Sequence, residues 1–401
     1  MDILSRFLSY ITIPTNSNFN TGFTPSTSTQ WNLAKKLVEE LKELGLDEVY
    51  LDENYCYVYA LLKGDKSIPK IGFISHMDTS EAVTDKNMKP QIIKNYDGSD
   101  VKLGEVEKLS VDVYPDLKHH IGKTLITTDG NTLLGADDKA GIAEIMEMLK
   151  FIIDNNIYHG DIYVAFTPDE EIGEGTKYFD LSRFKSDFAY TVDGSDLGEI
   201  SYDNFNAATI NINITGISTH LGSAKNVLVN SQLIANEFIN MFPKENPENT
   251  EKHEGYYHID SINGNVASTK IKVLIRDFET EEFENKKNTI ISIVKELNKK
   301  YNNCIEIKIK DTYYNMKNVI IQNMHLIDNA KKAMENLNII PITQEIRGGT
   351  DGAMLSEKGL PCPNLGTGGH NFHGIFEYIT VEDMEKTVEI LVEIVKLYAQ
   401  N

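Results

Sequence analysis

Five short segments, spread along the chain between residues 76 and 373, carry histidine and acidic side chains in patterns typical of metal ligands. These residues are His76 and Asp78 in ISHMD, Asp137 and Asp138 in GADDK, Glu170 and Glu171 in PDEE, Asp193 in TVDG, and His373 in NFHG. Two imidazoles and several carboxylates are the ligand set that a pair of zinc ions needs, with one acidic group left over to handle a proton. If the fold brings the five segments together, the sequence predicts a dinuclear metallohydrolase.

The two acidic pairs also have structural interpretations. Asp137 and Asp138 precede a predicted helix, where carboxylates by default cap the N-terminus and interact favourably with the helix dipole, without any metal. Glu170 and Glu171 are harder to explain in this way, because adjacent like charges at the end of a buried strand repel each other unless a cation neutralises one of them. This second pair favours a metal site.

The remaining ligand candidates are single residues. His76 could be a surface histidine, but Asp78 is placed to hydrogen-bond its ring and fix its tautomer. Asp193 could be a turn residue and His373 a core histidine, and His370 is a rival ligand three residues earlier. Each segment lies at the end of a strand-like run or beside glycines, so their combination favours one shared site.

Length and composition exclude several classes of protein. At 401 residues the chain exceeds the size at which a single core usually stops growing, so two domains are expected. Lys+Arg 39 against Asp+Glu 60 gives a net charge of −21, which argues against nucleic acid as a partner. No apolar run approaches the roughly 20 residues of a membrane span, and MDILSRFLSYITIP lacks the features of a secretory signal. The three widely spaced cysteines form no disulfide framework, and a cytoplasmic location is expected.

The hydrophobic pattern predicts an α/β sheet for the segments that carry the ligands. Buried strands are expected at Ile71–Ser75, Ile162–Thr167 and Phe188–Val192, with an amphipathic helix at Lys139–Asp154. Open α/β sheets place their sites at the carboxyl ends of their strands, where these segments lie. Further helices are expected at Ile3–Ile11 and Gln30–Leu44, a polar loop at 16–29, and a last helix opening at Thr380 with a capping box.

The pattern changes after Asp193. A β-α-β-α-β series is expected at Ala208–Ile214, Val227–Met241, Val266–Asp277, Glu279–Lys300 and Ile305–Lys310. This series predicts a small independent sheet covered by helices on one side. The catalytic part is therefore expected to be discontinuous, at 1–205 and 317–401, with an inserted domain at 206–316.

Longer motifs of the chain resemble those of a known family. The stretches GFISHMDTS, TLITTDGNTLLGADDKAGIAEIM, HGDIYVAFTPDEEIGEG, YTVDGSDLGEI, IRGGTDGAMLSEKGLPCPNLGTGGHNFHG and EYITVEDMEK resemble the co-catalytic zinc peptidase family that includes glutamate carboxypeptidase, succinyl-diaminopimelate desuccinylase and the carnosinases. More narrowly, they resemble its tripeptide aminopeptidases over essentially the whole chain. The resemblance implies a mixed-sheet catalytic domain with an inserted, smaller α+β sandwich of ferredoxin-like type that serves as lid and dimerisation domain.

The resemblance also implies a role for each motif residue. Two Zn²⁺ ions per subunit would be bound by His76, Asp137, Glu171, Asp193 and His373, with Asp137 bridging both ions. Asp78 would orient His76, and Glu170 would be the general base that acts on the attacking water. His220 in GISTHLG would reach the partner's active site in a homodimer and stabilise the oxyanion. The chain departs from the family in having Leu221 where proline is usual, and GGHNFH in place of Gly-Gly-Tyr-Asn-Tyr-His.

Two arginines are candidates for binding the substrate carboxylate. Arg276 in LIRD and Arg347 in RGGT could each grip a carboxylate at two points, because guanidinium groups present paired donors. Structural ion pairs are the alternative for both, more so for Arg276 than for the glycine-flanked Arg347.

The ligand set by itself defines hydrolysis, and not which end of the substrate is held. A dipeptidase, carboxypeptidase or deacylase therefore stays open on the same metals, and the whole-chain resemblance favours hydrolysis of the N-terminal residue of short peptides, chiefly tripeptides. A metal-bearing binding protein is disfavoured, because Glu170 and all five ligand positions are occupied by competent residues.

Overall fold

The structure is a computed structural model, and it describes residues 2–400. The chain divides into two compact units. Unit 1 comprises the residues up to Tyr202, Asn318–Gln344, and those from Thr350 onward, and unit 2 comprises Asp203–Lys317 and Glu345–Gly349. Unit 2 thus corresponds to an insertion, but it also takes in residues 345–349, which the sequence pattern assigns to the catalytic part.

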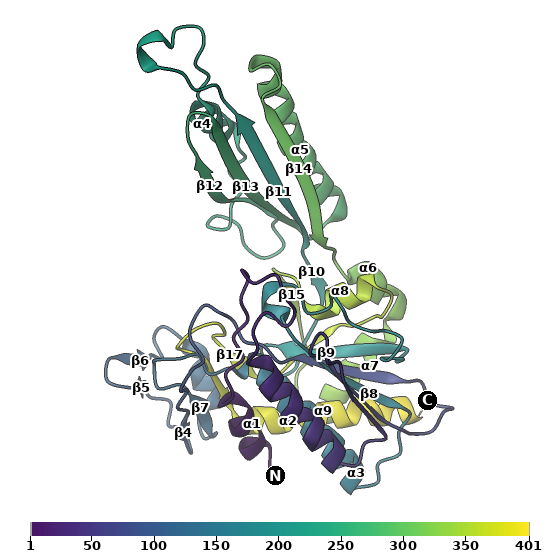
Figure 1. Cartoon of the computed structure of the whole chain (residues 1–401). Helices are drawn as coiled ribbons and strands as arrows, with labels where there is room; N and C mark the ends of the chain where they lie inside the picture. The colour runs from purple at the N-terminus through teal and green to yellow at the C-terminus, as the bar shows by residue number, and fades with distance from the viewer. Residues whose placement is uncertain (1, 401) are drawn as a thin grey trace. The chain divides into compact units, whose positions relative to one another are not determined.

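The main sheet has eight strands of mixed direction and belongs to unit 1 except for the last residues of β10 and β15 (Figure 1). Parallel pairing joins the central strands β8, β3, β9 and β16, and the flanking pairs β1–β2, β2–β8 and β16–β10 are antiparallel. Every residue of β2, β3 and β8 is buried, as in strands covered on both faces. In sheet order the strands are β1 (Glu48–Leu51), β2 (Val58–Leu62), β8 (Ile162–Thr167), β3 (Ile71–His76), β9 (Phe188–Gly194), β16 (Asn364–Gly366), β10 (Glu199–Asn204) and β15 (Ile342–Ile346).

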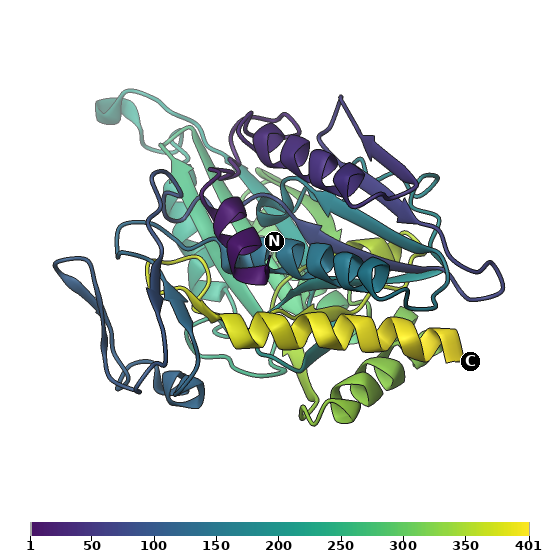
Figure 2. The same cartoon turned by 90° about the horizontal axis from the view of Figure 1, so that it is seen from below.

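Helices cover this sheet. In the view of Figure 2, α3 (Ala136–Asp154) and α9 (Val381–Gln400) lie side by side, with α1 (Ile3–Ile11) against α3 and α7 (His325–Asn336) against α9. Helix α3 also packs on β3 and β9, and α2 (Gln30–Glu43) packs on β1 and β2. The short helix α8 (Asp351–Glu357) contacts β9. No helix among residues 2–400 is both long enough and apolar enough to cross a membrane.

Smaller sheets of unit 1 were not expected from the sequence. One contains β17 (Gly369–His370), β18 (Tyr378–Thr380), β7 (Leu125–Thr127) and β4 (Gln91–Ile93), and another pairs β5 (Val101–Leu103) with β6 (Glu107–Leu109). Each of these strands has only two or three residues, too few to establish an alternating pattern. A 3-10 turn η1 (Pro115–His120) precedes β7.

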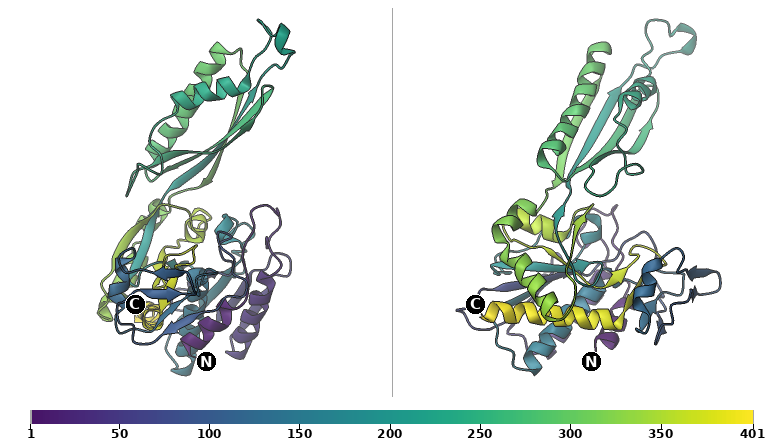
Figure 3. Two further views of the ribbon diagram at one scale, coloured as in Figure 1. Left: turned by 90° about the vertical axis from the view of Figure 1, so that its left-hand side faces the viewer. Right: turned by 180° about the vertical axis from the view of Figure 1, so that it is seen from behind.

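Unit 2 has a four-stranded antiparallel sheet in the order β12-β13-β11-β14, with two helices packed against it (Figure 3). In chain order it contains β11 (Asn206–Thr215), α4 (Ser231–Met241), β12 (Tyr256–Gly264), β13 (Ser268–Asp277), α5 (Thr280–Lys300) and β14 (Ile305–Tyr313). This order and pairing confirm the ferredoxin-like expectation. Strand β12 is absent from the predicted series, because it is an edge strand in which Tyr257 is the only buried residue, too little to establish an alternating pattern.

Candidate metal centre

Three adjacent strands deliver most of the predicted ligands to one edge of the main sheet. His76 is the last residue of β3, Glu170 and Glu171 lie in the 3-10 turn η2 (Glu170–Ile172) just after β8, and Asp193 is near the end of β9. Because β3 is parallel to both β8 and β9, the carboxyl ends of these strands meet at the same edge.

Asp137 and His373 approach from other elements. Asp137 lies at the start of α3, in non-helical conformation, and the peptide bond between Asp137 and Asp138 is cis. His373 lies in the loop between β17 and β18 with φ 62°, and its side chain is half exposed. Unit 1 therefore holds all five predicted ligands.

The carboxylate of Asp137 lies between the two imidazoles. Its Oδ1 is 2.9 Å from Nε2 of His76, and its Oδ2 is 3.0 Å from Nε2 of His373. Asp193 Oδ1 lies 3.3 Å from His76 Nε2, and Glu171 Oε2 lies 3.0 Å from His373 Nε2. Two half-sites therefore share Asp137: one with His76 and Asp193, the other with Glu171 and His373.

The imidazole of His76 is oriented by Asp78. Nδ1 of His76 lies 2.9 Å from the backbone carbonyl oxygen of Asp78 and 3.4 Å from its Oδ1. A proton on Nδ1 satisfies the carbonyl and leaves the Nε2 lone pair free for a metal. The backbone carbonyl is thus a closer partner of the ring than the carboxylate that the sequence pattern indicates.

Burial and crowding raise the proton affinity of the acidic groups. Burial, followed by repulsion from Asp137, raises the pKa of Glu171 to about 7. Burial raises the pKa of Asp193 to about 6, although His76 opposes the shift, and burial with repulsion from Asp193 raises that of Glu170 well above its usual value. These carboxylates carry more negative charge than the surrounding protein compensates.

The two histidine partners act in the opposite direction at Asp137. Burial would raise the pKa of Asp137, but the hydrogen bonds from His373 and His76 outweigh it and hold that pKa below its usual range. The same contacts with Asp137 and Glu171 raise the pKa of His373 to about 11. The charges of the site are thus arranged around positions that cations would occupy.

The donor set fits divalent metal ions. Ligand atoms of His76, Asp137 and Glu171 lie within 4.8 Å of one another, and so do those of His76, Glu170 and Asp193. Within residues 2–400, the buried Oε1 of Glu171 has no hydrogen-bond partner, as expected for an oxygen that a metal would engage. Imidazole nitrogens and carboxylate oxygens in this number match the preferences of Zn²⁺ and similar ions.

Asp138 plays a structural part beside the centre. Its buried Oδ2 accepts hydrogen bonds from the hydroxyl of Ser75 and, at 3.1 Å, from the backbone N–H of His76. Asp138 therefore holds the end of β3 through Ser75 and the backbone of His76.

Two buried acidic residues that support the site were missed by sequence reasoning. Glu377 accepts the backbone N–H groups of Leu134, Gly135 and Asp137 at 2.7, 2.9 and 3.1 Å, and so fixes the turn that presents Asp137. Asp351 Oδ2 accepts from the hydroxyl of Thr167 at 2.7 Å, at the end of β8. Asp351 belongs to the GGTDG motif, which offered a signal, whereas Glu377 has no local pattern that distinguishes it.

The other predicted residues belong to unit 2. His220 caps the 3-10 turn η3 (Leu221–Ser223), where its Nδ1 accepts the backbone N–H of Gly222 at 3.2 Å. Arg276 in β13 donates to the carbonyl oxygen of Ile275 at 2.9 Å and lies over the ring of Tyr313, 5.3 Å from its centroid.

Arg347 is held by the loop that precedes β12. Its guanidinium donates to the carbonyl oxygens of Lys252 and Glu254, the latter at 2.9 Å, and to the hydroxyl of Thr250 at 3.2 Å. It also lies over the rings of Phe205 and Tyr256. Much of its donor capacity is thus used within unit 2.

His370 belongs to a second cluster of side chains, not to the ligand set just described. Its ring stacks on Tyr378 with 4.7 Å between centroids and meets His120 edge to face, and its Nδ1 lies 3.3 Å from Asp196 Oδ1. Burial, followed by the neighbouring His120, lowers the pKa of His370 to about 4.

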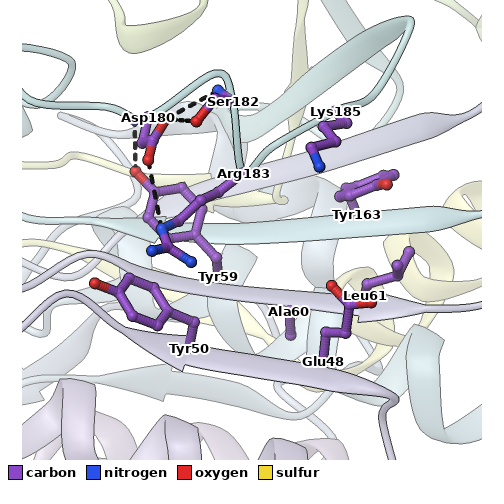
Figure 4. Close-up of a pocket in the computed structure, with 10 residues that line it drawn as sticks. All are labelled: Glu48, Tyr50, Tyr59, Ala60, Leu61, Tyr163, Asp180, Ser182, Arg183 and Lys185. Atoms are coloured by element: carbon purple, nitrogen blue, oxygen red, sulfur yellow. Dashed lines mark hydrogen bonds and ion pairs between the residues drawn. The ribbon is translucent and has the colours of Figure 1, made fainter.

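A separate pocket of about 390 Å³ opens at the β1 edge of the main sheet (Figure 4). It is lined by residues of β1, β2, β8 and the segment 180–185, and the guanidinium of Arg183 lies 3.7 Å from the ring centroid of Tyr50. None of the metal-centre residues lines this pocket.

Comparison with known proteins adds an independent line of evidence. The model of peptidase family M20/M25/M40 matches residues 119–397. A Peptidase T of Clostridium perfringens is 52% identical over 401 residues, covering 99% of this chain and 98% of the relative. A Peptidase T of Caldanaerobacter subterraneus subsp. tengcongensis is 52% identical over 406 residues, covering 100% and 99%.

A solved structure shares the fold. The crystal structure of the aminopeptidase PepT from Bacillus cereus superposes with a TM-score of 0.77 at 24% identity, covering 100% of this chain and 98% of that one. The resemblance seen in the sequence motifs, including its narrower form, is confirmed by these matches.

Proposed function

The chain belongs to peptidase family M20/M25/M40, and we propose that it is a zinc-dependent aminopeptidase that removes the N-terminal residue of short peptides, chiefly tripeptides. The observation that carries the proposal is the position of Asp137, whose two oxygens face the imidazoles of His76 and His373. A carboxylate so placed is suited to bridge two ions. The relatives named Peptidase T match over essentially their whole length and support the substrate class.

The proposed division of ligands follows the two half-sites. His76 and Asp193 would hold one Zn²⁺ ion, Glu171 and His373 the other, and Asp137 would contribute to both. When bound, two such ions supply a water of lowered pKa and polarise the scissile carbonyl group. Asp78 keeps the His76 ring in the tautomer that presents Nε2.

Glu170 is the proposed general base. Its carboxylate would accept the proton of the attacking water and deliver it to the nitrogen of the leaving amine. The backbone of Glu170 is fixed by a 2.9 Å hydrogen bond from its N–H to Asp78 Oδ1, so its position is tied to the residue that orients His76. Because Glu170 belongs to the same turn as Glu171, base and ligand share one support.

Oxyanion stabilisation is proposed for His220, supplied by the partner in a homodimer. Since Nδ1 of His220 accepts a hydrogen bond from Gly222, the neutral ring carries its proton on Nε2, which is the donor that an oxyanion requires. A homodimer is supported by exposed apolar side chains on unit 2. Leu233 and Ile239 of α4 and Ile262 of β12 are 67%, 38% and 44% exposed, and the last two line one shallow pocket.

The substrate's carboxylate is proposed to bind Arg276 or Arg347. Arg276 donates a hydrogen bond to the carbonyl oxygen of Ile275, and its guanidinium offers further N–H donors. Arg347 would have to exchange part of its contacts with residues 250–254 for the substrate. The proposed compartment is the cytoplasm, supported by three cysteines that are all free thiols.

Substrate specificity tests the function directly. Initial rates on matched di-, tri- and tetrapeptides, each free and N-acetylated, should be highest for free tripeptides, with release of the first residue. Loss of activity on the acetylated series supports recognition of a free N-terminus. Equal rates on acetylated peptides, or release of the C-terminal residue, would contradict the aminopeptidase assignment and favour a deacylase or carboxypeptidase.

A further inference from the structure

Asp169, the residue before Glu170, is held by the N-terminal part of the chain. Its buried carboxylate accepts the backbone N–H of Ser26 at 2.7 Å, the hydroxyl of Ser26 at 2.6 Å, and the side-chain amide of Gln30 at 2.7 Å. Asp169 has a φ of 58°, in the left-handed region that non-glycine residues seldom adopt. A conformation of this kind persists only where surrounding contacts impose it, and Ser26 and Gln30 provide them.

The other end of the same N-terminal segment is bound to the chain that follows Asp78. Asn16 and Thr79 form a parallel bridge, Ser17 donates its N–H to the carbonyl oxygen of Thr79 at 3.0 Å, and Asn16 donates its side-chain amide to that of Ser80 at 2.6 Å. Residues 15–30, which we call the N-terminal strap, are thus attached beside Asp78 at one end and beside Glu170 at the other.

The carboxylate of Asp78 connects the two places at which the strap is attached. Its Oδ1 and Oδ2 accept the backbone N–H groups of Glu170 and Glu171 at 2.9 and 3.2 Å. Within the strap, the N–H of Asn18 donates to the hydroxyl of Ser26 at 2.9 Å and ties its two ends together. The strap, the segment 78–80 and the turn that carries Glu170 are therefore joined in a closed ring of hydrogen bonds.

We propose that the N-terminal strap is a positioning element of the active site, in which Ser26 and Gln30 hold Asp169 and thereby set the direction of Glu170. The proposal rests on the proposed function for the role of Glu170 as base. Proton transfer needs its donor and acceptor within hydrogen-bond distance, so a small displacement of Glu170 lowers the rate of the chemical step. The strap contributes no metal ligand, so metal content should be independent of it.

The test compares Ser26→Ala and Gln30→Met with Ser28→Ala as the control. Ser28 lies in the same segment and is exposed. On a free tripeptide, Ser26→Ala and Gln30→Met should each lower kcat about 10-fold or more, with KM and the bound metal unchanged. Ser28→Ala should match the wild type. Ser26→Thr, which keeps the hydroxyl, should restore most of kcat.

Hydrogen exchange provides a readout that does not depend on activity. In the Ser26→Ala and Gln30→Met proteins, the amides of Glu170 and Glu171 should exchange faster than in the wild type, with the amides of β3 and β8 unchanged. Acceleration throughout unit 1 would instead indicate general destabilisation and overturn the proposal. A wild-type kcat together with unchanged hydrogen exchange at Glu170 in both variants would also overturn the proposal. Should the wild type lack peptidase activity, the proposed function fails, while the exchange measurement still decides whether the strap fixes the turn.

Discussion

Asp78 accepts the backbone N–H of Glu170 at 2.9 Å. The same residue places its carbonyl oxygen 2.9 Å from Nδ1 of His76. One aspartate thus fixes the orientation of the imidazole that is proposed to bind metal and the position of the turn that carries the proposed base. The proposed ligand His76 and the proposed base Glu170 are coupled through Asp78, although His76 is the last residue of β3 and Glu170 follows β8.

Glu170→Gln should abolish turnover while leaving two metal ions bound. A neutral amide cannot accept the proton of the attacking water, and all five proposed ligand residues remain. Metal analysis and kinetics on one preparation decide the outcome, with the exposed Glu43→Gln as a control that should behave as wild type. Near wild-type activity in Glu170→Gln would show that the roles of Glu170 and its neighbour are wrongly assigned.

Asp137→Ala should lose activity through loss of metal. Each carboxylate oxygen of Asp137 faces a different imidazole, so no single water replaces it at both positions. A chelator should likewise inactivate the wild type, and Zn²⁺ or a similar divalent ion should restore it. Full activity after prolonged dialysis against excess chelator would show that catalysis does not require a metal ion.

The sequence is most informative where a residue follows a regular element. His76, Glu171 and Asp193 lie at the ends of buried apolar strands, and such runs show both the strand and the edge at which it ends. The backbone N–H of Asp383 likewise donates to the hydroxyl of Thr380 at 3.2 Å, the N-terminal cap that the motif predicts, and this hydroxyl donates to the Asp383 carboxylate at 2.6 Å. Local patterns of this kind can be recognised without knowledge of the tertiary structure.

Hydrogen bonds between polar residues that are far apart in the chain produce no recognisable pattern in the sequence. Asp169 and Ser26 are 143 residues apart, and the sequence of the strap predicts only a polar loop. Glu377 is equally hidden, because its three backbone partners lie far away in the chain. Hydrogen bonds of this type impose no periodicity on either partner, so only the folded arrangement reveals them.

His370 should make stability depend on pH between about 6.5 and 4. Its pKa in the folded protein is about 4 against an ordinary value of 6.5. Between these values the unfolded chain binds a proton that the folded protein does not, so the free energy of unfolding falls as pH falls through this window. The full effect is on the order of 3 kcal/mol at the low end.

His370→Phe isolates this contribution. Urea unfolding at pH 7 and pH 4.5 should show a smaller loss of stability in the variant than in the wild type, since the other titrating groups are common to both. Phenylalanine keeps the stacking on Tyr378 but cannot titrate. The same pH dependence in both proteins would show that His370 is not the group responsible.

His220→Ala should lower kcat by roughly 10²–10³-fold, the amount expected for one oxyanion donor. Its metal content should remain that of the wild type, because His220 is not among the residues of the metal centre. A monomeric protein of full activity would contradict the shared site. The exposed Leu221→Ala, next to His220, is a control for changes in the turn itself.

Hybrid dimers test whether His220 acts in the partner's site. If it does, exchange of His220→Ala subunits with Glu170→Gln subunits should restore activity, because one site of each hybrid then has both groups intact. The matched control pairs the wild type with the double variant, which leaves no intact site when His220 acts across the dimer but one intact site when it acts within its own subunit. Verified hybrids that remain inactive in the first mixture and active in the second would place His220 in its own subunit.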